Sequence, residues 1–272
     1  MAVDRFGFVP TSIMDFSRDD RWQLMTPEIR ELMGKVEHKR GMENKENLVA
    51  TQFNSGLCRF LVQYYTDPGD VVLDPFAGWG TRAYCCMLLG RKYLGFDVAK
   101  STVEAVNKAL DGVRQRALDG EKTGSAVVYF ADGIRLDGIP DSSADAILTC
   151  PPYANREIYE AVDTTVGYQL SRMDLGYFEM FMKRGLKRWW TVLKPGGLAV
   201  FVVGDWRDEA QLYPFASNMV AWALDAGFQF HDIILHKLRT ATAMGIGTFM
   251  KSKFVVRAHE YVLVFKRPGE KA

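Results

Sequence analysis

Two short stretches of the sequence hold residue types that could do chemistry together. The first, Asp74 to Thr81, reads DPFAGWGT and places a carboxylate and two close glycines after an apolar run. The second, Thr149 to Tyr153, reads TCPPY and follows another apolar run. Glycines let the backbone turn sharply and approach a ligand, whereas prolines hold the chain in a fixed direction. The two stretches therefore predict a pocket in which a glycine turn faces a rigid proline segment.

The glycine turn alone is ambiguous. GWGTRA, from Gly78 to Ala83, fits the dinucleotide pattern GxGxxG/A. In that pattern, backbone amides and a helix N-terminus bind a pyrophosphate, which the neighbouring Asp74 carboxylate would repel. Asp74 instead favours a ligand that presents a cation, such as the ammonium of S-adenosylmethionine, which has no phosphate. A nicotinamide oxidoreductase is the rival from another enzyme class, and it rests on GWGTRA alone.

Two further aspartates follow expected strands and extend this site. Asp97 closes YLGFD seventeen residues after Gly80, near the spacing at which an acidic residue binds the ribose hydroxyls of a nucleoside. Asp132, in FADG, is placed to accept from an adenine amino group. A lone aspartate more often caps a helix or forms a turn. Three of them at consecutive strand ends favour a shared cofactor.

The TCPPY segment has residues suited to methylation of an amine. The exocyclic amine of a nucleobase is a poor nucleophile because its lone pair is delocalised into the ring. Backbone carbonyls fixed by Pro151 and Pro152 would pull the amine towards tetrahedral geometry and free that pair for in-line attack. Tyr153 offers a flat face on which an extruded base stacks. The alternative is that the prolines only stiffen a loop.

The remaining sequence predicts the elements that position these residues. Short apolar runs alternate with amphipathic segments, which is the pattern of a parallel sheet covered by helices on both faces. Expected strands are 71–74, 93–97, 126–130, 146–150, 198–204, 230–235 and 260–265, and expected helices are 81–89, 100–118, 175–192 and 212–225. The predicted fold class is α/β, a doubly wound Rossmann-like sheet of seven strands whose last strand is antiparallel.

Together these motifs resemble those of the DNA amino-methyltransferases, which modify the exocyclic amine of cytosine or adenine. DPFAGWGT resembles their cofactor motif DPFxGxGT, TCPPY their catalytic (D/N/S)PPY, and FNSGLCRFLVQYYTDPGDVVLDPF the segment before the cofactor motif. CPPY followed by Glu157 and Tyr159 is most similar to phage and bacterial orphan enzymes. The resemblance covers Thr51 to Arg267.

The resemblance implies a class I methyltransferase that takes S-adenosylmethionine as cofactor and duplex DNA as partner, with the target base flipped out and no metal. It assigns catalysis to Cys150, Pro151, Pro152 and Tyr153. It assigns cofactor binding to Phe53, Asn54, Asp74, Phe76, Gly78, Gly80, Thr81, Asp97 and Asp132. An RNA amino-methyltransferase and an inactive, cofactor-binding DNA-binding factor are the alternative functions.

Cys150 departs from the family, which usually has Asp, Asn or Ser before the two prolines. A thiol is a weak hydrogen-bond acceptor, so the usual polarising side chain is missing. Its serine-like size favours the N4 amine of cytosine over the N6 amine of adenine, because SPPY is the cytosine variant. Covalent attack on carbon five of cytosine is an alternative, but no His or Lys near Cys150 in sequence supplies the partner that a thiolate needs. A buried, inert thiol is another alternative.

We expect residues 1–50 to form an N-terminal extension and residues 51–272 to form the catalytic domain. Within that domain, the loop 236–257 holds most of the local positive charge. A basic loop suits a polyanion such as nucleic acid, although a charged surface loop is equally common. The residues assigned to nucleic-acid binding are Lys237, Arg239, Lys251, Lys253 and Arg257.

Composition narrows the protein class further. Lys plus Arg (34) nearly balances Asp plus Glu (33), so only local clusters can mark an acidic partner. The four cysteines form no CxxC pair and the four histidines are scattered, so we expect neither a zinc site nor a disulfide framework. No secretory leader or membrane span is expected, and the chain should be cytoplasmic.

Overall fold

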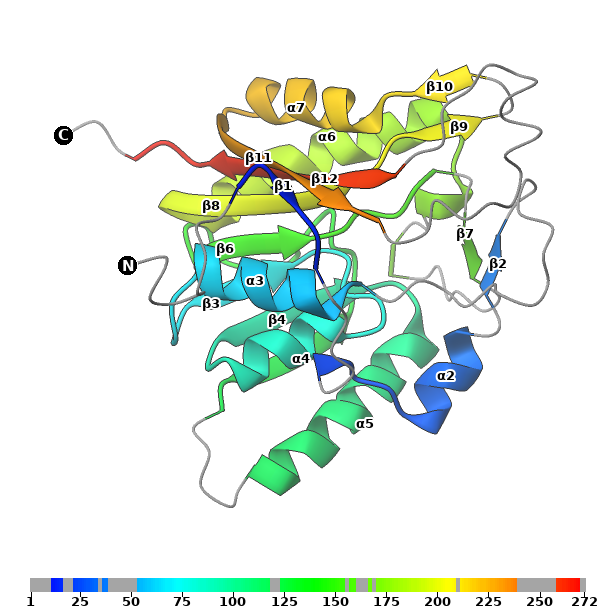
Figure 1. Cartoon of the computed structure of the whole chain (residues 1–272), viewed down its shortest axis with the longest axis vertical. Helices are drawn as coiled ribbons and strands as arrows, with labels where there is room; N and C mark the ends of the chain where they lie inside the picture. Colours follow the sequence, from blue (N-terminus) through cyan, green and yellow to red (C-terminus); the bar gives the residue numbers. More distant parts are fainter. Residues whose placement is uncertain are drawn as a thin grey trace.

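The central sheet has eight strands among the residues that the computed structural model describes, namely 11–16, 22–33, 36–38, 53–117, 123–154, 157–159, 166–167, 170–208, 211–238 and 258–269. Figure 1 shows this sheet with helices on both of its faces. The strands are, in spatial order, β1 (Ile13–Met14), β11 (Gln229–Lys237), β12 (His259–Lys266), β8 (Leu193–Val203), β6 (Ala144–Thr149), β3 (Val71–Asp74), β4 (Lys92–Asp97) and β5 (Ser125–Phe130).

Strand order and direction confirm the doubly wound α/β class. β5, β4, β3, β6 and β8 run parallel to one another. β12 lies antiparallel to both β8 and β11, so the last strand is antiparallel as expected. The expected number of seven strands was wrong by one, because Ile13 and Met14 add a short parallel strand beside Leu235 and His236. Two residues are too short a run for a periodic strand pattern.

Side chains alternate along the strands and build a hydrophobic core on each face of the sheet. In β3, Val72 packs into one core and Leu73 into the other. The first face is covered by α3 (Ser55–Tyr65), α4 (Thr81–Leu88) and α5 (Lys100–Ala117), and the second by η2 (Leu170–Arg172), α6 (Leu175–Val192) and α7 (Phe215–Asp225). α4, α5 and α6 confirm three expected helices, whereas α3 was not expected.

α7 begins three residues later than expected. Gln211–Tyr213 forms β10, which pairs antiparallel with β9 (Trp206–Asp208) in a separate two-stranded sheet. Pro214 follows β10 and precedes the first helical residue, Phe215. The apolar residues Leu212 and Tyr213 that suggested a helix therefore belong to a hairpin strand.

The described part of the N-terminal segment packs on the rest of the chain. Leu24 is buried, and its Cδ2 lies 3.2 Å from the position that a Cβ on Gly80 would take. α2 (Pro27–Met33) packs against α5. β2 (Val36–His38) pairs antiparallel with β7 (Glu157–Tyr159), a few residues after the CPPY segment. The division of the chain at residue 51 stays a prediction, but these N-terminal residues contact the regions of both motifs.

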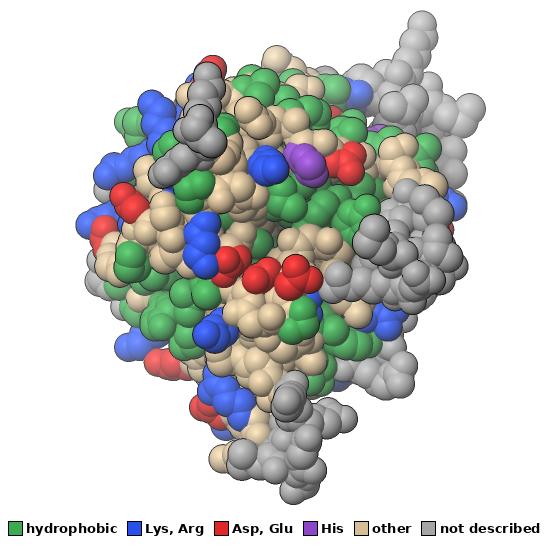
Figure 2. Space-filling model, turned by 90° about the vertical axis from the view of Figure 1, so that its left-hand side faces the viewer, with side chains coloured by type: hydrophobic (Ala, Val, Ile, Leu, Met, Phe, Trp, Pro, Cys, Tyr) green, Lys and Arg blue, Asp and Glu red, His purple; other side chains and the backbone are tan. Residues whose placement is uncertain are grey.

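The two ends of the parallel strands lie on opposite sides of the sheet and carry different residues. At the edge where the parallel strands begin, basic and acidic side chains are interspersed over the surface (Figure 2). The opposite edge, where the parallel strands end, holds the glycine turn and the CPPY segment. None of the helices in the described ranges combines the length and the apolar content that a membrane crossing requires.

Candidate active site

The two motifs meet where the neighbouring strands β3 and β6 end. The backbone register between these strands ends at Leu73 and Ile147. Beyond it the strands part, since Asp74 pairs with β4 and Thr149 pairs with β8. A doubly wound sheet opens in this way where successive crossovers leave in opposite directions, and such switch points are where these folds bind ligands.

The glycine turn joins β3 to α4. Gly78 and Gly80 have φ angles of +52° and +77°, in the left-handed region that favours glycine. A Cβ on Gly80 would also lie 2.7 Å from Cγ1 of Val106, so a larger residue does not fit there. Asp97 accepts from the Gly78 amide at 2.9 Å and, through its other oxygen, from the Ala99 amide at 2.9 Å. The shape of the turn therefore depends on both glycines and on Asp97.

Asp74 has a different role from the one that its position suggested. Its carboxylate is fully buried, and each oxygen accepts two hydrogen bonds. Oδ1 accepts from the Phe76 amide at 3.0 Å and from Thr149 Oγ1 at 2.6 Å. Oδ2 accepts from Arg82 Nε at 2.5 Å and from the Tyr93 hydroxyl at 2.6 Å. The expectation that Asp74 meets the ammonium of a ligand is corrected, because its partners are protein groups and they enclose it.

Arg82, in the first turn of α4, was not assigned from the sequence and neutralises Asp74. Its Nη2 also donates to the Phe76 carbonyl at 2.5 Å, and its guanidinium carbon lies 4.9 Å from the centroid of the Phe53 ring. Burial alone lowers the pKa of Arg82, but the Asp74 carboxylate more than offsets this effect, so the pKa is raised and the group is charged. Phe53 therefore lies beside the glycine turn.

Thr81, the first residue of α4, provides a test of whether the cofactor fits. Thr81 is 2% exposed, and its Oγ1 has no hydrogen-bond partner among the described residues. Backbone amides at a helix N-terminus also lack intrahelical partners and attract anions. The carboxylate of a methionine moiety would satisfy both, so the residues present fit S-adenosylmethionine. Asn54 uses its side-chain oxygen differently, since it caps α3 and accepts from the Leu57 amide at 2.8 Å.

Asp97 is the last residue of β4, and Asp132 lies two residues beyond the end of β5. Burial raises the pKa of both carboxyl groups. Asp132 Oδ1 accepts from the Ile134 amide at 2.8 Å. The intervening Gly133 packs so closely on the Pro75 carbonyl oxygen that a Cβ would lie 1.9 Å from it. Each carboxylate oxygen can accept a second hydrogen bond, so both side chains fit donors of a nucleoside.

The CPPY segment leaves the sheet directly after Thr149, the last residue of β6. Pro151 is buried, and Cys150 is half-buried against the core that α3 and α4 cover. Cys150 also interacts electrostatically with Arg82.

Tyr153 is half-buried in an aromatic cluster that was not predicted. Its ring centroid lies 5.4 Å from that of Trp206 and 6.2 Å from that of Phe215. Trp206 packs in turn on Tyr213 at 4.4 Å and on Phe215 at 5.2 Å. These rings hold the Tyr153 ring in place. The available sequence signal was an aromatic residue two positions beyond an expected strand end, in VVGDW.

Of the basic residues assigned to nucleic-acid binding, only Lys237 lies within the described ranges. It is exposed at the carboxyl end of β11, on the same edge as the motifs, and its Nζ lies 3.5 Å from Asp15 Oδ2. The others, Arg239, Lys251, Lys253 and Arg257, lie outside the described residues. Across the ranges that the structure describes, no group of three or more His, Cys, Asp or Glu could hold a metal ion.

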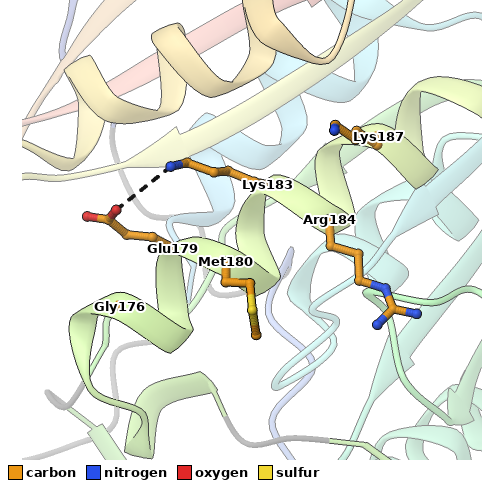
Figure 3. A pocket seen from close by; sticks show the side chains of 6 residues that line it. All are labelled: Gly176, Glu179, Met180, Lys183, Arg184 and Lys187. Carbon is orange, nitrogen blue, oxygen red and sulfur yellow. Dashed lines mark ion pairs between the residues drawn. The ribbon is translucent and has the colours of Figure 1, made fainter.

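A groove of about 480 Å³ lies on α6, apart from the motifs (Figure 3). Lys183 Nζ lies 3.9 Å from Glu179 Oε2, one turn earlier on the same helix. Its lining is Gly176, Glu179, Met180, Lys183, Arg184 and Lys187. Because α6 supplies the whole lining and no strand end contributes to it, the groove is a surface feature separate from the candidate active site.

The sheet order, the antiparallel β12 between β8 and β11, and the glycine turn after β3 define a Rossmann-like methyltransferase fold. A SAM-dependent methyltransferase from Methanosarcina mazei has the same fold, with a TM-score of 0.51 and 15% identity, over 77% of this chain and 98% of that one. S-adenosylmethionine is the cofactor of this class.

Sequence comparisons indicate which kind of methyltransferase the chain is similar to. The N6_N4_Mtase family model, described as DNA methylase, matches residues 18–108. Type II methyltransferase M.MthZI of Methanothermobacter thermautotrophicus is 23% identical over 158 residues, which cover 52% of this chain and 44% of that one. DNA adenine methyltransferase YhdJ of Escherichia coli is 28% identical over 103 residues, which cover 38% and 28%. The chain therefore spans less than half the length of either relative. The resemblance to the DNA amino-methyltransferases is confirmed, whereas the CPPY variant of their catalytic motif stays a prediction.

Proposed function

We propose that this protein transfers a methyl group from S-adenosylmethionine to the exocyclic amine of a base in duplex DNA. The proposal rests mainly on the meeting of the glycine turn and the CPPY segment at the parted ends of β3 and β6. There, Thr149 Oγ1 lies 2.6 Å from Asp74 Oδ1, so the two motifs share one buried carboxylate. The DNA methylase family model and the type II methyltransferase relative support the same reaction.

The residues around the glycine turn would hold the cofactor by its separate parts. Thr81 and the N-terminus of α4 suit the methionine carboxylate, since the buried hydroxyl lacks a partner among the described residues. Asp97 suits the ribose hydroxyls and Asp132 the adenine amine, because both carboxylates keep acceptor capacity. Phe53 and Phe76 flank the turn. When bound, S-adenosylmethionine supplies a methyl group that its sulfonium makes electrophilic.

The CPPY segment would prepare the amine for attack. The carbonyls of Cys150 and Pro151 accept hydrogen bonds from the amine and release its lone pair from the ring. Tyr153, held by Trp206, stacks on the flipped base and fixes its plane. After methyl transfer, the positively charged amine loses its extra proton to solvent or to a nearby acceptor. Catalysis of this kind relies on position and on fixed dipoles rather than on a nucleophile of the protein.

Cytosine N4 is the target that we place ahead of adenine N6. The small side chain before the prolines, Cys150, is closest in size to the serine of the cytosine variant SPPY. If that size is what matters, Cys150→Ser should keep the activity and Cys150→Ala should lower it modestly. Steady-state assays on both variants would check this. Complete loss of activity in Cys150→Ser would instead indicate that the thiol attacks the base.

Transfer of a labelled methyl group tests the proposed function. Wild-type protein and labelled S-adenosylmethionine are incubated in three parallel reactions. One contains duplex DNA of mixed sequence, one contains the same DNA as single strands, and one contains transfer RNA. We expect label in the duplex DNA. Label only in transfer RNA would favour an RNA amino-methyltransferase. Binding of cofactor and DNA without transfer to any acceptor would favour an inactive DNA-binding factor.

A further inference from the structure

We propose that Thr149 is a positioning residue, whose hydroxyl sets the distance between the cofactor turn and the segment that presents the amine. This inference rests on the proposed function. It adds Thr149 to the site, a residue that was assigned neither to catalysis nor to cofactor binding. Thr149 Oγ1 donates to Asp74 Oδ1 at 2.6 Å, and both side chains are fully buried.

The hydrogen bond lies at the point where the sheet no longer joins the two motifs. Backbone pairing between β3 and β6 ends at Leu73 and Ile147, one and two residues before Asp74 and Thr149. At Asp74 the backbone pairs with β4, and at Thr149 it pairs with β8. The side-chain bond therefore bridges the opening of the switch point, in place of the missing backbone bonds.

Each end of the bridge is tied to one half of the reaction. On the cofactor side, Asp74 holds the Phe76 amide and the Arg82 guanidinium, which start the turn and the following helix. On the acceptor side, Thr149 directly precedes Cys150, the first residue of the CPPY segment. A shift of Thr149 relative to Asp74 would move the amine relative to the sulfonium methyl. In-line transfer is sensitive to such shifts, and a displacement of about 1 Å can cost roughly a hundredfold in rate.

Tyr93 offers a matched control for this role. Its hydroxyl also donates to the Asp74 carboxylate at 2.6 Å and is also buried, but it comes from β4, on the far side of the turn from the CPPY segment. Tyr93→Phe and Thr149→Val each remove one buried hydroxyl from the same carboxylate, and both preserve the side-chain shape. A purely structural role predicts similar effects of the two substitutions on the reaction.

The test compares wild type, Thr149→Val, Thr149→Ser and Tyr93→Phe. Methyl transfer is measured in single turnovers with cofactor and DNA saturating, and the Kd of S-adenosylhomocysteine is measured by calorimetry. We expect Thr149→Val to slow transfer about ten- to a hundredfold while the Kd stays close to that of wild type. Thr149→Ser should restore the rate, and Tyr93→Phe should slow transfer much less than Thr149→Val.

Equal losses in Thr149→Val and Tyr93→Phe, or no rescue by Thr149→Ser, would overturn the positioning role. A loss in Thr149→Val that appears only in the Kd would overturn it as well. If Thr149→Val does not fold, Thr149→Ala replaces it in the same comparison. A wild-type protein that transfers no methyl group to DNA would contradict the proposed function itself, and this inference with it, before any variant is compared.

Discussion

Arg82 Nε lies 2.5 Å from Asp74 Oδ2, and both side chains are almost completely removed from solvent. The pair as a whole is electrically neutral, although the sequence suggested that Asp74 presents its negative charge to a ligand. Asp74 therefore joins parts of the site through its hydrogen bonds to side chains of α4, β4 and β6. Buried pairs of this kind tolerate the loss of one partner poorly, because an unpaired charge is left inside the protein.

Removing the cation should destabilise the fold. Arg82→Met leaves the Asp74 carboxylate buried without its counter-charge, which we expect to lower the free energy of unfolding by about 3–5 kcal/mol. The double variant with Asp74→Asn should lose less than the sum of the two single variants. Denaturant titration followed by two spectroscopic probes measures these free energies.

The control for that experiment is an exposed ion pair. Lys108 Nζ lies 2.9 Å from Glu28 Oε1 on the surface of α5 and α2. Lys108→Met should leave the unfolding midpoint unchanged, because surface pairs contribute little. Equal destabilisation by Arg82→Met and Lys108→Met would contradict the role assigned to the buried pair.

Asp97 predicts opposite pH dependences of stability and cofactor binding. Burial raises its folded-state pKa above the ordinary value of 3.8. At a pH between the unfolded-state and folded-state pKa of Asp97, the folded protein therefore binds more protons than the unfolded chain. The stability that Asp97 contributes is thus present below pH 3.8 and is lost as the pH rises through the folded-state pKa. Cofactor affinity should change in the other direction, because the ionised carboxylate is the better acceptor for ribose hydroxyls.

Calorimetric titration with S-adenosylhomocysteine from mildly acidic to neutral pH measures this dependence. We expect affinity to rise with pH in wild type, and the rise to be smaller in Asp97→Asn. Asp97→Ala should weaken binding at every pH, since it also removes the acceptor of the Gly78 amide. A pH dependence that is identical in wild type and Asp97→Asn would exclude Asp97 as its source.

Tyr153 should act on the base and not on the cofactor. A stacked base is worth about 1–3 kcal/mol per aromatic ring, so Tyr153→Ala should slow transfer roughly ten- to a hundredfold. Tyr153→Phe keeps the ring and should stay much closer to wild type. The comparison needs transfer rates and the Kd of S-adenosylhomocysteine for both variants. Weaker cofactor binding in Tyr153→Ala, with an unchanged transfer rate, would indicate that the ring contacts the cofactor and not the base.

The basic loop should contribute to DNA affinity through its charge. Replacing Lys251 and Lys253 with alanine should weaken DNA binding and reduce its dependence on salt, because fewer counterions are released on binding. Lys92→Ala is the control, since Lys92 is exposed at the start of β4, on the edge opposite to the motifs. Fluorescence anisotropy over a range of salt concentrations gives both slopes. A slope equal to that of wild type would make the loop an ordinary charged surface.

Sequence patterns predicted the parts of this fold whose signals are local. VVLD and YLGFD are short apolar runs that end in aspartate, and both form strands with the expected carboxyl ends. α3 was missed although Leu57, Phe60 and Leu61 have helical spacing and are buried. Its start signal was Asn54, a helix cap that the family resemblance assigned to cofactor binding instead.

Sequence patterns could not predict which side chains contact the site residues. The side chains that donate to Asp74 come from positions 82, 93 and 149, which lie on α4, β4 and β6. Only the folded sheet brings them to one carboxylate. The support of Tyr153 by Trp206 likewise joins two segments, one following β6 and one following its neighbour β8.

Identification of the methylated atom tests the central claim most directly. Duplex DNA treated with the protein and labelled S-adenosylmethionine is digested to nucleosides, which are separated and identified by mass spectrometry. The account predicts that the label is found in N4-methylcytosine, or in N6-methyladenine if the target is adenine. Label in 5-methylcytosine, or DNA that gains no label while the protein binds the cofactor, would contradict it.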